Sequence, residues 1–252
     1  MAEPRPDDAA PAERSAGAVC VPQGVEGDAG AAFDGAPRVL LLHGLGRSPR
    51  SLRLLARRLR AAGLEVAAPA WPATRWAARI AEDAALTAAE AAEAAFGDRR
   101  FHAVGHSLGG VLAAQLKARA PLRVGRIVAL GAPFAGSPAA ARAARLTAWL
   151  GPLSARARLG PALDALAEGA PMAPALPAGA QALCVAGTRA VPGVGAVLGL
   201  TGRHDGRVAR ESALALPGAA RADVRAEHAW LPLSAEAARC TVAFLRDGPT
   251  RR

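Results

Sequence analysis

Hydrophobic residues gather in short continuous runs that alternate with longer stretches of helical spacing. The runs predict strands at 38–42, 64–68, 101–106, 126–130 and 182–186, with a shorter one at 222–225. Runs without polar alternation are typical of strands buried on both faces. Helical spacing marks the segments 48–62, 75–95, 108–120 and 236–246. The alternation predicts an α/β fold with a mostly parallel sheet of about six strands and helices on both faces.

Two segments depart from this alternation. Residues 1–35 are rich in proline, acidic and small residues, and we expect them to form a disordered leader before a single domain at 36–248. The segment 137–181, between the fourth and fifth predicted strands, mixes leucines and Trp149 with proline and glycine. This pattern predicts either a cap-like helical insertion over a site or two surface helices that cover a sheet edge.

The charge of the chain bears on whether it binds nucleic acid or an anionic membrane. The formal net charge is +10, but the cations are mostly arginines spread along the chain, and aromatic residues make up only 4%. Single-strand nucleic-acid sites interleave cations with aromatic side chains, so we expect no nucleic-acid partner. Weak contact with an anionic membrane surface stays open. No apolar run is long enough to predict a membrane span.

The cysteines indicate neither a metal site nor a disulfide framework. Cys20, Cys184 and Cys240 are far apart in the sequence, and their spacing matches no zinc motif. The N-terminus is acidic and broken by proline, unlike a secretory signal. We therefore expect a reduced, cytoplasmic protein that uses no metal and no cofactor.

A Gly-x-Ser-x-Gly pentapeptide at residues 105–109 is the first candidate for chemistry. It lies between the predicted strand at 101–106 and the helix that follows Ser107. At such a junction a sharp turn exposes the serine hydroxyl, and the two glycines let strand and helix pass closely. Ser107 is therefore the candidate nucleophile. We expect the neighbouring His106 to point away and to have a packing role.

A serine nucleophile needs a base, and the base needs a carboxylate that fixes its tautomer. His228, after the last short strand, is the favoured base, with His204 as the alternative. Asp205, in the loop after the fifth strand, is the favoured acid. Its rivals are Asp164, in the insertion, and Asp223, on the last strand.

The oxyanion formed during acyl transfer needs N–H donors close to the nucleophile. The backbone N–H of Leu108, directly after Ser107, is one candidate. The loop 43–47 follows the first strand, and Gly44 allows the chain to turn there. We expect the second donor to be the N–H of Leu45, with Gly46 as a weaker alternative.

These elements occur in the order His-Gly, serine elbow, acid, histidine, which resembles the α/β-hydrolase superfamily. The segment Gly131–Ser137 is similar to a Gly-[Thr/Ala]-Pro-x-x-Gly-Ser segment of bacterial triacylglycerol lipases and inositol-deacylase-like relatives. The resemblance spans about residues 38 to 246. The strand before His43 corresponds to the third strand of the full superfamily sheet, so the resemblance implies a minimal version without the first hairpin.

The resemblance implies a serine esterase or lipase-like enzyme that cleaves small-molecule or lipid acyl esters through Ser107, His228 and Asp205 and a covalent acyl-enzyme. A thioesterase or acyltransferase with the same triad, and a non-catalytic binding protein of the same fold, are the alternatives. We expect Phe134 and Trp149 to contact the substrate, together with the leucine- and alanine-rich insertion. The acyl-chain length, the alcohol and the oligomeric state are not set by the sequence.

Overall fold

The computed structural model describes residues 35–73, 80–167 and 172–248. Within these residues six strands form one sheet in the order β2-β1-β3-β4-β5-β6. Every neighbouring pair is parallel. This confirms the predicted fold class. The strands are β1 (Arg38–Leu42), β2 (Glu65–Ala67), β3 (Phe101–His106), β4 (Val124–Leu130), β5 (Ala182–Gly187) and β6 (Ala220–Val224).

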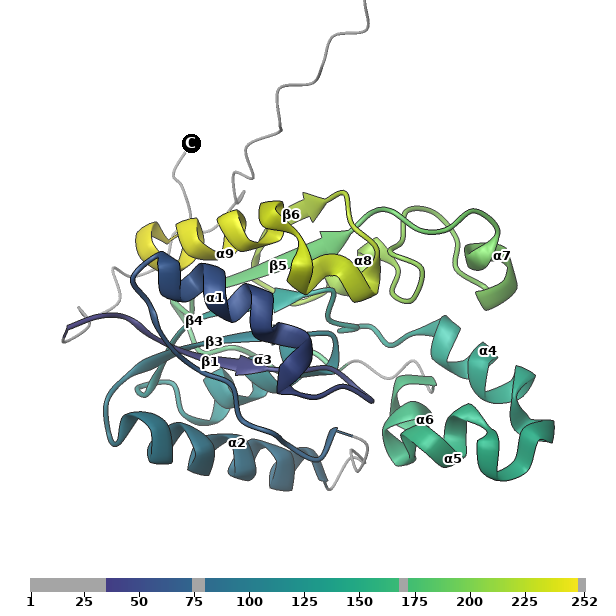
Figure 1. Cartoon of the computed structure of the whole chain (residues 1–252), viewed down its shortest axis with the longest axis horizontal. Coiled ribbons are helices and arrows are strands. Elements are labelled where there is room, and N and C mark those ends of the chain that lie inside the picture. The colour runs from purple at the N-terminus through teal and green to yellow at the C-terminus, as the bar shows by residue number, and fades with distance from the viewer. Residues whose placement is uncertain (1–34, 74–79, 168–171, 249–252) are drawn as a thin grey trace, which may run out of the picture.

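Helices cover both faces of the sheet (Figure 1). Successive side chains of β1 point to opposite faces: Leu40 and Leu42 pack in one hydrophobic cluster, and Val39 and Leu41 pack in the other. The first cluster includes residues of α2 and α3, and the second includes residues of α1 and α9. This two-sided burial explains why the strands lack polar alternation. The four helices are α1 (Arg53–Ala61), α2 (Ile80–Phe96), α3 (Leu108–Arg119) and α9 (Ala235–Asp247).

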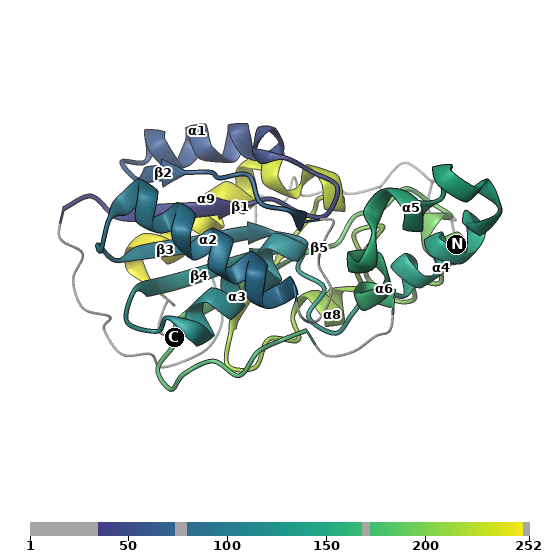
Figure 2. The same ribbon diagram turned by 90° about the horizontal axis from the view of Figure 1, so that it is seen from below.

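The segment between β4 and β5 forms a separate group of short helices. Figures 1 and 2 both place it beyond the carboxyl ends of the strands. Its first helix begins at Pro138, and the Ser137 hydroxyl caps it by accepting a hydrogen bond from the Ala140 N–H at 3.3 Å. The group contains α4 (Pro138–Leu146), η3 (Ala148–Leu153), α5 (Ala155–Leu159) and α6 (Pro161–Ala167).

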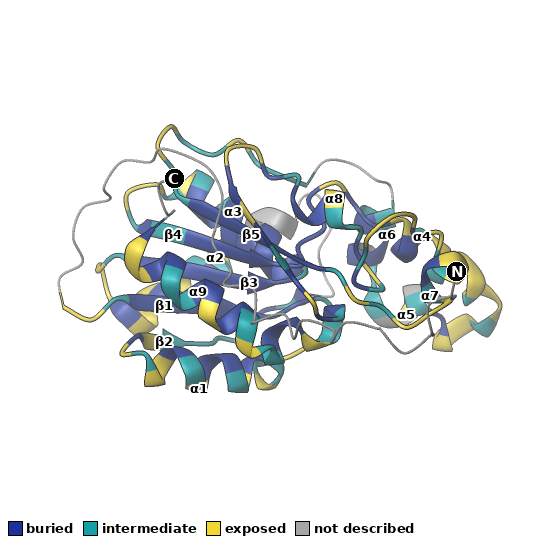
Figure 3. Ribbon diagram, turned by 90° about the horizontal axis from the view of Figure 1, so that it is seen from above, coloured by how far each residue is buried: buried dark blue, intermediate teal, exposed yellow. Residues whose placement is uncertain are grey.

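The remaining short elements lie in loops. They are η1 (Pro49–Leu52), α7 (Val194–Leu198), α8 (Arg210–Ala213) and η4 (His228–Leu233). The central strands β1, β3, β4 and β5 are largely buried, whereas exposed residues lie mainly on loops, on the outer faces of helices and on the edge strands β2 and β6 (Figure 3). The loops at the carboxyl ends of the strands are therefore places where residues next to the core can contact solvent.

Element boundaries differ modestly from the sequence predictions. The predicted helix at 48–62 is divided into a 3₁₀ turn, which begins at Pro49, and α1. The strand predicted at 126–130 begins at Val124. The start of the helix predicted at 75–95 and nearly all of the predicted leader at 1–35 lie outside the described residues.

The described residues settle two further points from the sequence. No helix among them is long and apolar enough to cross a membrane. Cys184 is a free, buried thiol, and burial raises its pKa to about 12. Cys240 is disulfide-bonded, which differs from the expectation of a fully reduced chain.

Candidate active site

Ser107 occupies a strained turn between β3 and α3. Its backbone has φ 55° and ψ −125°, and it is the only non-glycine residue with positive φ in the described part of the chain. Such conformations cost free energy and persist where the surrounding structure enforces them. A Cβ on Gly105 would lie 2.0 Å from the Gly109 carbonyl oxygen, and one on Gly109 would lie 2.2 Å from that of Leu42. The two glycines thus allow the close strand–helix passage that the pentapeptide predicts.

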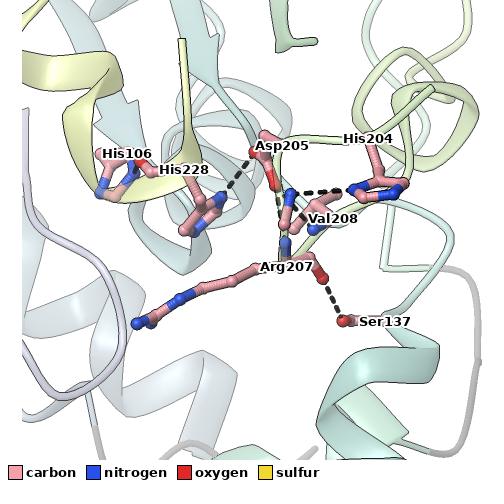
Figure 4. A network of polar contacts seen from close by, with 8 residues as sticks. His106, Ser137, His204, Asp205, Arg207, Val208 and His228 are labelled. Atoms are coloured by element: carbon pink, nitrogen blue, oxygen red, sulfur yellow. Dashed lines mark hydrogen bonds and ion pairs between the residues drawn. The ribbon is translucent and has the colours of Figure 1, made fainter. Parts of the chain in front are cut away.

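A buried histidine–carboxylate pair lies at the same end of the sheet (Figure 4). His228 Nδ1 donates to Asp205 Oδ2 at 2.7 Å, and the residues are 5% and 2% exposed. The second carboxylate oxygen accepts from the N–H groups of Arg207 at 3.0 Å and Val208 at 2.8 Å. The backbone N–H of His228 also donates to the Asp205 carbonyl oxygen at 2.9 Å. These contacts fix the ring and the tautomer of His228 and leave Nε2 as its unprotonated nitrogen.

The rival acid and base have other partners. The Asp223 carboxylate accepts hydrogen bonds from Arg203 at 3.0 Å and from Arg210 at 2.8 Å. His204 Nδ1 accepts from the Gly206 N–H at 3.1 Å. The structure therefore pairs Asp205 with His228, whereas Asp223 and His204 make other hydrogen bonds.

His106 has a contact that sequence reasoning missed. Its Nε2 donates to the His228 carbonyl oxygen at 2.9 Å, and the two ring centroids are 4.8 Å apart. Burial lowers the pKa of His106 well below its ordinary value, and the nearby His228 ring and the positive charges of Arg47 and Arg207 act in the same direction. The neutral ring with its proton on Nε2 holds the backbone of the base. Its position at the carboxyl end of β3, opposite the loop after β6, could have suggested this contact.

The two predicted oxyanion donors, the N–H groups of Leu45 and Leu108, belong to chain segments that adjoin Ser107. Leu108 is the first residue of α3, where N–H groups have no acceptor within the helix. The chain at Gly44 lies against the nucleophile, because a Cβ there would be 2.9 Å from Ser107 Cβ. His43 Nδ1 donates to the Gly44 carbonyl oxygen at 3.1 Å. Carbonyl and following N–H point in opposite directions across a trans peptide, so the Leu45 N–H is turned away from His43.

A cavity of about 500 Å³ joins these groups. Ser107 and His228 line it together with the loop 44–47 and Arg207. One wall is apolar and comes mainly from the helices between β4 and β5. Its side chains are those of Ala139, Ala140, Ala143, Leu159, Leu163, Leu166 and Leu198.

The two aromatic residues predicted to contact substrate lie elsewhere. Phe134 is 1% exposed and belongs to the hydrophobic core, and it is not among the residues that line the cavity. Trp149 is 81% exposed, and its Nε1 donates to the Leu146 carbonyl oxygen at 3.0 Å. The apolar lining consists of leucines and alanines instead. Aromatic residues in a loop or insertion were an insufficient guide, because their direction depends on how the helices pack.

A larger cavity, of about 810 Å³, lies at the amino ends of the strands. Arg100, Lys117, Arg126 and Arg246 contribute to its lining, as does His102. No serine, cysteine or carboxylate is among the described residues that line it. The candidate nucleophile Ser107 and the candidate base His228 line the smaller cavity instead. Nor does any cluster of three or more histidine, cysteine or carboxylate side chains in the described ranges suit a metal ion.

Comparisons with known proteins agree with the observed fold. Residues 37–155 match the family model for the alpha/beta hydrolase fold, whereas no curated protein sequence matches the chain. The mature form of a lipase from Bacillus licheniformis is 19% identical with a TM-score of 0.60, and the match covers 86% of this chain and 93% of the lipase. The chain thus has the α/β-hydrolase fold, as its sequence resemblance predicts.

Two other solved structures with this fold are a hydrolase and a carboxylesterase. A pyrethroid hydrolase from Sphingobium faniae is 17% identical with a TM-score of 0.56, covering 84% of this chain and 98% of that one. A carboxylesterase from Bacillus subtilis is 18% identical with a TM-score of 0.51, covering 86% and 87%. Lipases and esterases are therefore among the structural neighbours of this chain.

Proposed function

We propose that the protein is a serine hydrolase that cleaves carboxylic acyl esters. The observation that carries this proposal is the buried His228–Asp205 hydrogen bond of 2.7 Å at the same cavity as Ser107 in its strained elbow. A histidine that serves only as a packing residue needs no carboxylate at Nδ1 and need not line the same cavity as a serine in a strained elbow. The lipases and esterases among the structural neighbours support the same activity.

The reaction follows from the roles of these groups. Ser107 Oγ attacks the ester carbonyl carbon while its proton passes to His228 Nε2. Asp205 stabilises the imidazolium that results, and the Leu45 and Leu108 N–H groups bind the oxyanion. The intermediate collapses, the C–O bond to the alcohol breaks, and the alcohol takes the proton from His228. A water molecule activated by His228 then attacks the acyl-enzyme and releases the acid and Ser107.

The apolar wall defines the acyl side of the substrate. Leu163 and Leu166 of α6 are 3% and 6% exposed and face the cavity with the alanines of α4. Hydrocarbon placed against them leaves water, which contributes about 0.8 kcal/mol per buried CH₂. In this proposal the helices at 138–167 act as a cap that binds the acyl chain.

The proposed reaction needs no cofactor or metal, and its partner is a small-molecule or lipid ester. Cytoplasmic location stays a prediction from the N-terminal composition. The disulfide at Cys240 does not favour it, because disulfides persist mainly in oxidising compartments.

The direct test is hydrolysis of p-nitrophenyl acetate, butyrate and octanoate by the purified protein, with Ser107→Ala as the blank. We expect measurable turnover by the wild type and a loss of about 10⁶-fold in kcat for the variant. Circular dichroism and thermal melting of both proteins control for folding. Equal rates for wild type and Ser107→Ala would overturn the proposal.

A further inference from the structure

Two arginines stand beside the candidate catalytic groups at the mouth of the cavity. Arg47 and Arg207 both line it, and both are exposed. No carboxylate is among the described residues that line this cavity. The mouth therefore combines a cationic rim with an apolar inner wall.

The backbone of Arg207 is held firmly while its side chain is not. Its N–H donates to Asp205 Oδ1 at 3.0 Å, and its carbonyl oxygen accepts from the Ser137 hydroxyl at 2.8 Å. No hydrogen bond or ion pair within the described chain engages its guanidinium. Figure 4 shows the side chain extending away from these backbone contacts without a dashed contact at its end. The fold thus fixes the backbone of Arg207 and leaves the N–H groups of its guanidinium available to a ligand.

Arg47 is placed by the loop that carries a proposed oxyanion donor. Arg47 follows Leu45 by two residues, and its backbone N–H donates to the Gly44 carbonyl oxygen at 3.2 Å. No salt bridge of the described residues includes Arg47 either. Two guanidinium groups with ten N–H donors in total thus face one cavity from two different loops.

Nothing charged within the described lining offsets these two cations. Asp205 lies behind His228, where its carboxylate already accepts three hydrogen bonds. The charges of both arginines reach the interior, because they contribute to lowering the pKa of the buried His106. An anionic group at the mouth would therefore meet a positive potential and free donors.

We propose that Arg47 and Arg207 select esters whose alcohol portion carries an anionic group, a carboxylate or a phosphate. The ester carbonyl would lie at Ser107 and the acyl chain against the buried leucines of α6, which leaves the alcohol at the exposed rim. The preferred substrate class is thus an amphipathic acyl ester with an anionic alcohol. This inference rests on the proposed esterase activity and adds the charge of the substrate to it.

The test compares kcat/KM for three butyrate esters with similar phenolic leaving groups. They are 3-carboxyphenyl, 3-phosphonooxyphenyl and 3-carbamoylphenyl butyrate, and only the last is neutral. We expect the wild type to prefer the anionic esters over the neutral ester by about tenfold at low salt, as charge-assisted hydrogen bonds at a partly exposed site would give. The preference should shrink as salt screens the charges. The carboxylate and phosphate arms distinguish the two sources of anionic charge.

The variants Arg47→Gln, Arg207→Gln and the double variant assign the effect. Each single change should lower the preference for the anionic esters about threefold, and the double change should abolish it. Arg57→Gln, an equal loss of charge on the exposed side of α1 and away from this cavity, is the matched control. It should leave the preference unchanged.

The outcomes separate this inference from the proposed function. Equal kcat/KM for neutral and anionic esters in the wild type, or an undiminished preference in the double variant, overturns the inference and leaves the esterase proposal intact. An effect of Arg57→Gln as large as that of Arg207→Gln would mean that net charge alone is responsible, which also overturns it. If no ester is hydrolysed, the proposed function fails and the inference fails with it.

Discussion

A buried histidine lies at each end of the sheet, and the Nδ1 atoms of the two rings have opposite hydrogen-bonding roles: one accepts and the other donates. At the amino ends, His102 Nδ1 accepts a hydrogen bond from the Arg126 N–H at 2.9 Å. Burial lowers the pKa of His102 to about 3, with Arg126 and Arg100 adding to the shift. At the carboxyl ends, His228 Nδ1 donates to the Asp205 carboxylate at 2.7 Å.

This difference shows that the partner, rather than burial, decides what a histidine can do. A ring that accepts a backbone hydrogen bond among arginines stays neutral and serves the structure. A ring whose Nδ1–H is held by a carboxylate can take a second proton at Nε2, because the carboxylate stabilises the imidazolium. The larger cavity lies beside His102 and the smaller beside His228, so cavity size is a poorer guide than the hydrogen-bond partner.

The largest expected effect on kcat is found by substituting each of the two histidines in turn. His228→Gln and Asp205→Asn should each lower kcat for p-nitrophenyl butyrate by about 10⁴-fold or more, since loss of the base or of its correct tautomer stops proton transfer. His102→Asn keeps an acceptor for the Arg126 N–H and should leave kcat within about threefold. Steady-state kinetics on folded variants decides between them. A His102→Asn variant as inactive as His228→Gln would break the comparison.

A smaller effect tests the loop beside Ser107. Gly44→Ala places a Cβ 2.9 Å from Ser107 Cβ and 3.1 Å from the His106 carbonyl oxygen. The loop must shift, and we expect kcat to fall about 10²–10³-fold through loss of an oxyanion donor. Gly97→Ala is the control: its Cβ would meet nothing within 4 Å, and its φ of +63° costs about 1–2 kcal/mol of stability. Unchanged kcat in Gly44→Ala would argue against the Leu45 donor.

The smallest expected effect is on how the free energy of unfolding changes with pH. Above pH 6.5 His102 is neutral in both the folded and the unfolded chain, whereas below it only the unfolded chain gains the proton. The free energy of unfolding should therefore fall by up to about 1.4 kcal/mol per pH unit from this residue as pH decreases toward 3. Urea unfolding between pH 7 and 4 should give a shallower decline for His102→Asn than for the wild type. His43 and His106, whose pKa values burial also lowers, maintain part of the slope in the variant.

Much of this arrangement follows from local sequence patterns. The apolar runs predict the strands because burial on both faces excludes polar residues from them, as at β1 and β5. The glycines around Ser107 predict the elbow because only glycine tolerates such close backbone approach. Chain order after successive strands favours Asp205 and His228 over their rivals, since the carboxyl ends of parallel strands meet at one edge, but it does not by itself exclude Asp164, Asp223 or His204.

The rest depends on contacts that no local pattern encodes. Phe134 packs inside the core and Trp149 lies on the surface because of how the helices at 138–167 dock. The contact between His106 and the His228 carbonyl joins residues 122 positions apart. The two rim arginines are equally hidden in a sequence with 31 basic residues, because only the folded loops show which cations share a cavity.

Covalent labelling tests the central claim most directly. We expect a fluorophosphonate probe to add one phosphonyl group to the wild-type protein, located on Ser107 by peptide mass spectrometry, because a phosphonate mimics the tetrahedral intermediate. Ser107→Ala should remain unlabelled, and His228→Gln should label far more slowly. Folded wild-type protein that gains no mass, or that carries the label on another residue, would contradict the assignment of Ser107 as an activated nucleophile.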